Sequence, residues 1–192
     1  MKRCLLLLPL TLLLVQCHKN SPDPAKPEDQ LPAATQTGAG TFGCLLNGQP
    51  WTPSGGGLLG TPNLLLTYDP SYHGGNLVLT AYRLVTSGTD QKQYIGFGGD
   101  QIGTLGTYTV HTPTAFPPSE PQSVGFYDDS KSNPCNDYNN FILHAGTTTT
   151  GHFTLTRLDK QQGIVSGTFE FTLTQPGCDT IKITNGRFDY KL

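Results

Sequence analysis

A strict alternation of side-chain polarity near the C-terminus most constrains what this chain can fold into. From Val165 to Thr174 the odd-numbered positions are apolar or glycine, and the even-numbered positions are polar. A period of two is typical of a β-strand that packs one face against a core and exposes the other to water. We therefore expect a long strand here, as part of an antiparallel sheet.

A second alternating run follows after a short turn, and it changes phase part of the way along. Ile181 and Ile183 are apolar positions before Asn185-Gly186, whereas Phe188 and Tyr190 are apolar positions after it. A β-bulge produces such a change, because one extra residue exchanges the two faces of the strand and glycine accepts positive φ. A two-residue hairpin turn at Asn185-Gly186 is the alternative. We favour the bulge.

The first sixteen residues resemble the signal peptide of a bacterial lipoprotein. A basic start, Met1-Lys2-Arg3, precedes a Leu-rich run that is too short to span a bilayer comfortably and that ends at Gln16-Cys17. The resemblance implies removal of residues 1–16 and acylation of Cys17, which would hold the protein firmly in a membrane. Gln16 stands where such signals have a small residue, so an ordinary secretory peptide or an uncleaved anchor is the alternative.

Residues 17–40 are rich in proline and polar side chains and show no periodicity. Such a segment cannot bury enough apolar surface to fold, so we expect a disordered, semi-extended tether behind the lipidated cysteine. Residues 41–192 have the length of one ordinary domain. The anchor and tether predict a location in the cell envelope, and we expect the outer membrane, on its periplasmic or its surface face.

Residues 41–192 carry the pattern of an all-β domain. Short apolar or alternating runs are separated by turn residues, and no run has the periodicity of a helix of three turns. About nine or ten strands in near-sequential order predict an antiparallel meander, folded as a β-sandwich or a partly closed lipocalin-like barrel. The strands expected before the C-terminal pair are 41–46, with a return from Gln49 after Asn47-Gly48, and 64–68, 76–84, 94–99, 107–110, 124–127, 141–144 and 152–158.

The cysteines predict one disulfide. Cys4 leaves with the leader and Cys17 carries the lipid, so three remain in the domain. Cys44 falls among the inward residues of its strand, where it should be a buried free thiol. Cys135 and Cys178 lie in loops, and an exported chain is oxidised, so we predict that these two are bridged.

The sequence contains no recognisable catalytic or zinc-binding motif. Its histidines lack zinc-ligand spacing, and no Ser lies at a nucleophile elbow. The formal charge is −2, or −4 once Lys2 and Arg3 leave with the leader, and no basic stripe exists that would favour nucleic acid. We therefore predict a protein that is not an enzyme, takes no cofactor and does not bind nucleic acid.

One loop has the composition of a weak calcium site. Asp128, Asp129, Asn133 and Asp137 supply oxygen ligands of the kind that calcium takes, although they lack the EF-hand order. Asn- and Asp-rich loops are more often turn formers, so we interpret this loop first as a turn.

The two ends of the domain resemble a known family. The motifs are Thr41-Phe42-Gly43-Cys44 with Asn47-Gly48-Gln49-Pro50-Trp51, and Gly163-Ile164-Val165-Ser166-Gly167-Thr168-Phe169-Glu170-Phe171 with Ile183-Thr184-Asn185-Gly186-Arg187-Phe188-Asp189. They are similar to an uncharacterised family of bacterial envelope lipoproteins, classed as a domain of unknown function. The resemblance implies a lipid-anchored all-β domain and transfers no catalytic residue.

Two functions fit this reading, and a third fits less well. The first is a lipid-anchored envelope lipoprotein whose domain binds a protein or a glycan, or serves a structural role, without catalysis. The alternative is a lipocalin-like carrier of a small apolar ligand, for which the glycines of Ile95-Gly96-Phe97-Gly98-Gly99 would leave internal space. A glycan-binding module as such, or a hydrolase with its site on the loops, is the less favoured hypothesis.

Overall fold

The protein is described by a computed structural model over residues 26–55, 62–85, 91–112, 122–139 and 146–192. The predicted signal peptide and Cys17 lie outside these residues, as does the strand expected at 141–144. The elements are η1 (Pro27–Gln30), β1 (Thr41–Leu46), β2 (Gln49–Trp51), β3 (Leu64–Asp69), β4 (Asn76–Leu84), β5 (Lys92–Gly99), β6 (Gly106–His111), β7 (Gln122–Asp128), β8 (Asp137–Asn139), β9 (Thr148–Asp159), β10 (Ile164–Thr174) and β11 (Ile181–Lys191).

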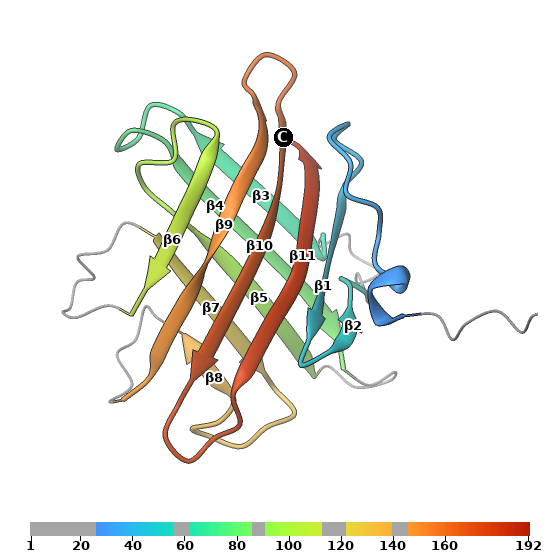
Figure 1. The fold of residues 1–192 in the computed structure, drawn as a ribbon, viewed down its shortest axis with the longest axis vertical. Helices are drawn as coiled ribbons and strands as arrows, with labels where there is room; N and C mark the ends of the chain where they lie inside the picture. Colours follow the sequence, from blue (N-terminus) through green and yellow to red (C-terminus); the bar gives the residue numbers. More distant parts are fainter. Residues whose placement is uncertain (1–25, 56–61, 86–90, 113–121, 140–145) are drawn as a thin grey trace, which may run out of the picture.

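The strands form two antiparallel sheets packed face to face (Figure 1). One sheet has six strands in the order β2-β1-β11-β10-β9-β6, and the other has five in the order β3-β4-β5-β7-β8. The predicted all-β class is confirmed, and of the two predicted architectures the sandwich is the observed one, because the sheets do not close into a barrel. The described residues contain eleven strands, one more than the upper expectation.

The phase change in the last strand is a β-bulge, as favoured from the sequence. β11 runs without a break from Ile181 to Lys191, so the hairpin turn at Asn185-Gly186 is wrong. Its pairing with β10 shifts between Phe169, which faces Gly186, and Phe171, which faces Ile183. Two residues of β11 are therefore opposite Glu170, and Asn185 adopts a left-handed φ of 52°. The extra residue returns Phe188 to the core.

An aromatic cluster fills the space between the sheets. The ring of Phe97 on β5 lies 4.8–5.8 Å, centroid to centroid, from four phenylalanine rings of the six-stranded sheet, those of Phe153, Phe169, Phe171 and Phe188. Of the three glycines expected to leave internal space, Gly96 and Gly98 pair with the outward Thr80 and Val78 and so face away from the core, whereas Gly99 pairs with the buried Leu77. The space at the centre of the described core is therefore occupied by side chains.

The hairpin of β1 and β2 contributes two further core residues, Trp51 and the predicted free thiol Cys44. Asn47 and Gly48 have φ of 49° and 80°, and Leu46 pairs with Gln49, so the predicted two-residue turn is confirmed. Trp51 is fully buried, and its indole Nε1 donates to Gln93 Oε1 at 3.1 Å. Cys44 is a buried free thiol, as expected, and burial raises its pKa to about 12.

The predicted disulfide Cys135–Cys178 is present. It joins the polar loop between β7 and β8 to the turn between β10 and β11. Two hydrogen bonds reinforce this junction, from Gln175 Nε2 to the carbonyl of Pro134 at 2.8 Å and from Tyr138 Oη to the carbonyl of Asp179 at 2.6 Å.

The tether expected over residues 17–40 differs from the structure in its second half. Residues 26–40 pack against the domain, and Leu31 is only 7% exposed. Pro32 lies directly over Gly43 of β1, where a β-carbon would approach the proline ring to 2.6 Å. The folded unit therefore includes residues 26–40, which were expected in the tether, because contacts with distant strands order a segment whose own composition favours disorder. Among the described residues, no helix has the length and apolar character needed to cross a bilayer.

Candidate binding site on the outer face of the six-stranded sheet

The predicted calcium loop uses its carboxylates for its own structure. Asp128 is buried and accepts hydrogen bonds from Gln93 Nε2 at 2.7 Å and from the amide and hydroxyl of Ser130 at 3.0 and 2.6 Å. Asp129 accepts the amide of Lys92 at 3.0 Å. No three His, Cys, Asp or Glu side chains converge on a metal-sized site within the described parts of the chain. The loop is a turn former, and Asp128, Asp129, Asn133 and Asp137 do not form a common ligand set.

The histidines are also dispersed. His73 Nδ1 lies 2.9 Å from Asp100 Oδ2, and Asn76 Nδ2 donates to the other oxygen of that carboxylate at 2.8 Å. The hydrogen bond from His73 is the main cause that lowers the pKa of Asp100. This exposed pair joins the β3–β4 loop to the end of β5. His144 lies outside the described residues.

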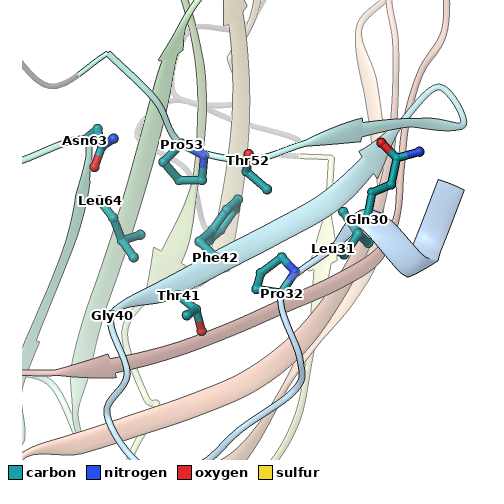
Figure 2. A pocket seen from close by; sticks show the side chains of 10 residues that line it. All are labelled: Gln30, Leu31, Pro32, Gly40, Thr41, Phe42, Thr52, Pro53, Asn63 and Leu64. Atoms are coloured by element: carbon teal, nitrogen blue, oxygen red, sulfur yellow. The ribbon is translucent and has the colours of Figure 1, made fainter.

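A first depression of about 420 Å³ lies where β1 faces β3 across the edge of the sandwich (Figure 2). Phe42 and Leu64 come from the two strands, and Leu31 and Pro32 cover the side toward η1. Its rim is polar but uncharged, with Gln30, Thr41, Thr52 and Asn63. None of these lining residues titrates near neutral pH, so this depression offers apolar contact and hydrogen bonds but no acid–base chemistry.

A second depression of about 370 Å³ lies at the β-bulge, on the outer face of the six-stranded sheet. Unlike the first depression, it is lined by ionisable side chains: Glu170 on β10, Arg187 on β11 and His152 on β9. Thr168, Phe169, Asn185 and Gly186 complete its base, and Ala34 of the N-terminal segment forms one wall. Strand register explains the grouping, because His152 pairs with Glu170 and Thr168 pairs with Arg187.

In this depression Glu170 has a nearby ionisable partner, His152, whereas Arg187 has none among the described residues. His152 Nδ1 lies 3.7 Å from Glu170 Oε1, a loose pair whose partners are both well exposed. Arg187 has no carboxylate within salt-bridge distance among the described residues. The depression thus presents one cation available to a ligand, next to the amide of Asn185 and the hydroxyl of Thr168.

The wall of the depression is held by a buried carboxylate. Asp189 on β11 is fully buried and accepts hydrogen bonds from the amides of Thr37, Gly38 and Ala39 at 2.9, 2.8 and 3.1 Å. The hydroxyls of Thr35, Ser166 and Thr37 also donate to it, at 2.7, 2.6 and 3.3 Å. We call residues 35–39 and this carboxylate the Asp189 clamp.

The clamp overcomes the cost of burying a charge. Burial by itself raises the pKa of Asp189, but the hydrogen bonds from Ser166, Thr35, Ala39 and Thr37 outweigh it and hold the pKa well below the ordinary value. Arg157 on β9 adds a hydrogen bond to the carbonyl of Gln36 and is itself oriented by Asp159 at 2.8 Å. Ala34 is therefore fixed beside Arg187 and Thr168 by charged contacts on its C-terminal side.

The depression offers a ligand hydrogen bonds and charge. Its lining contains one carboxylate, that of Glu170, whereas acid–base work on a glycosidic bond uses a pair. His152 faces Glu170, and Thr168 supplies the hydroxyl of the lining.

The sequence indicated parts of this site but not the site. The alternation placed Glu170 and Thr168 on the wet face of the strand, and the phase change placed a bulge beside them. Ala34 was missed because it lies in a segment whose composition favours disorder, and no local signal joins it to a strand 150 residues away.

No protein-family model, curated protein or solved structure matches this chain.

Proposed function

We propose that this protein is a lipid-anchored cell-envelope lipoprotein whose all-β domain is a non-catalytic binding module. The observation that carries the proposal is the Leu-rich leader that ends at Cys17 behind a basic start. The disulfide Cys135–Cys178 supports it, because such bonds persist in oxidising compartments outside the cytoplasm. The resemblance of both ends of the domain to envelope lipoproteins is in line with this proposal.

The clamped N-terminal segment gives the proposal a geometric consequence. Lys26 belongs to the described segment that packs against the domain, and eight residues lie between it and Cys17. The nine residue steps from Cys17 to Lys26 span at most about 30 Å when fully extended. A tether that ran to residue 40 would span at most about 80 Å by the same measure. The domain is thus held close to the membrane surface, and its partner would be a component of that surface or of the adjacent wall.

The carrier hypothesis receives less support from the described core. It depended on internal space beside the glycines of β5, and Phe97 with its four aromatic neighbours occupies that place. The concave polar surface lies outside the sandwich, where a surface-bound ligand is accessible. This contrast favours a binding module over a carrier of apolar ligands.

Metabolic labelling tests the anchor directly. Cells that express the full-length chain are fed an alkyne analogue of palmitate, and the protein is examined by click labelling and by membrane fractionation, with and without globomycin. We expect label and membrane association in the wild type, loss of both in Cys17→Ser, and accumulation of a precursor with globomycin. An unlabelled protein that stays soluble inside the cells would refute the proposal.

A further inference from the structure

We propose that the depression at the β-bulge binds a carboxylate-bearing sugar, such as a uronate residue of an acidic glycan. The inference rests on the proposed binding function and names the ligand class for its site. Its first ground is Arg187, whose guanidinium has no carboxylate partner among the described residues although the base of a depression surrounds it. A guanidinium recognises a carboxylate through two parallel hydrogen bonds, so an anionic group of the ligand would fill this position.

The other polar groups fit the hydroxyls of a sugar ring. Glu170, Asn185 and Thr168 lie within the same depression, and a carboxylate or an amide offers two hydrogen-bonding atoms that match neighbouring hydroxyls. Glu170 faces the imidazole of His152, whose Nδ1 lies 3.7 Å from its Oε1, and not the guanidinium of Arg187. The lining therefore combines one available cation with several hydrogen-bonding groups.

The depression continues into a hydroxyl-rich surface. Threonines face outward from the neighbouring strands at Thr107, Thr109, Thr150, Thr154 and Thr172, in register with the lining residues. Thr107 Oγ1 and Thr154 Oγ1 lie 2.9 Å apart, so the row already forms hydrogen bonds across strands. Such a surface offers hydrogen bonds to further sugar units and little to an apolar partner, which favours an oligosaccharide over a lipid.

Two features that cost free energy of folding lie at this depression. Asn185 holds a left-handed conformation that most residues avoid, and strained backbone of this kind is frequent at binding sites. The Asp189 clamp buries a carboxylate to hold residues 35–39, which directly follow Ala34, the wall of the depression. Both features give the depression a fixed shape, and a preorganised site loses less entropy on binding.

Isothermal titration calorimetry with the mature lipidated protein in detergent micelles tests the inference. The probes are tetrasaccharides of galacturonate and of mannuronate, the neutral cellotetraose, and sodium acetate as the carboxylate alone. We expect saturable binding of at least one acidic tetrasaccharide, at least about tenfold weaker binding of cellotetraose, and no saturation by acetate, because one charge-assisted pair contributes about that factor.

Matched variants assign the binding to the depression. Arg187→Gln removes the available cation, and we expect at least about tenfold weaker binding of the acidic tetrasaccharide. Lys182→Gln removes the same charge from the same face of β11 outside the depression, and we expect less than about a twofold change. Circular dichroism melting shows that both variants fold.

Several results would overturn the inference. They are the absence of binding for both acidic tetrasaccharides, equal affinity for cellotetraose, acetate binding as tightly as the acidic sugars, and equal losses in Arg187→Gln and Lys182→Gln. These outcomes leave the labelling of Cys17 unaffected, so failure of the ligand class is distinguishable from failure of the anchor.

Discussion

Asp189 is a fully buried carboxylate whose two oxygens both accept hydrogen bonds. A buried carboxylate normally takes a proton, since burial disfavours its charged form. Here three amides and three hydroxyls donate to it at 2.6–3.3 Å. Donors of this kind favour the ionised form, so the charge itself holds residues 35–39 against β10 and β11.

Replacement of Asp189 by Asn should destabilise the domain by about 2 kcal/mol at pH 7, because an amide cannot accept all these hydrogen bonds. The folded-state pKa lies below the unfolded-state value of about 3.9. The contribution of Asp189 is therefore complete above about pH 5 and declines as the pH falls below that range.

Urea unfolding of the wild type and Asp189→Asn at pH 7 and pH 3 measures this effect. We expect the difference in free energy of unfolding between the two proteins to shrink at pH 3. Asp179→Asn, which changes an exposed carboxylate, should match the wild type at both values. A difference for Asp189→Asn that is the same at both pH values would contradict the role given to its charge.

Phe97 is the residue on which both sheets converge. Its ring contacts four rings of the opposite sheet, so removal of the ring leaves a cavity that rigid strands cannot close. We expect Phe97→Ala to lower the free energy of unfolding in urea by about 3–5 kcal/mol. Phe97→Leu keeps most of the side-chain volume and should lower the free energy of unfolding clearly less. Equal losses in the two variants would argue against a packing role for the ring.

At the scale of the elements, the disulfide Cys135–Cys178 holds the polar loop before β8 against the turn between β10 and β11. The bond Cys135–Cys178 closes 43 residues of chain, and a loop of this size contributes about 4 kcal/mol by constraining the unfolded state. The double variant Cys135→Ser with Cys178→Ser should lose stability of this order in urea. The wild type in the presence of a reductant serves as the control and should unfold at the same urea concentration as the variant. An unchanged midpoint in the variant would show that the link does not stabilise the fold.

How far each element could be predicted depends on where its ordering contacts come from. The β-bulge was predictable, because the exchange of faces after Asn185 leaves a trace in the local sequence. β8 was not, since only Tyr138 of its three residues is apolar and its order comes from pairing with β7 and from the nearby disulfide. The candidate site follows the same rule: Glu170 and its wet face were visible in the alternation, whereas the wall at Ala34 was not.

At the scale of the whole molecule, the clamp attaches the N-terminal segment of residues 26–40 to the folded body. Residues 26–40 contain no periodic pattern, yet Leu31 is buried and residues 35–39 bind Asp189. Their order therefore comes from a residue near the opposite end of the chain. Under the proposed anchoring at Cys17, the same residues would set the distance between the domain and the membrane.

Limited proteolysis tests this coupling. With proteinase K under native conditions, we expect the protected fragment of the wild type to retain residues 27–40, as read from its mass. In Asp189→Ala the donors of residues 35–39 lose their acceptor, and local opening of a segment with few buried contacts then costs little free energy. We expect the fragment of this variant to begin close to residue 40, while the core strands remain resistant. As a control, Thr109→Ala on the same sheet should give the wild-type fragment, and retention of residues 27–40 in Asp189→Ala would show that Leu31 and Pro32 alone hold the segment in place.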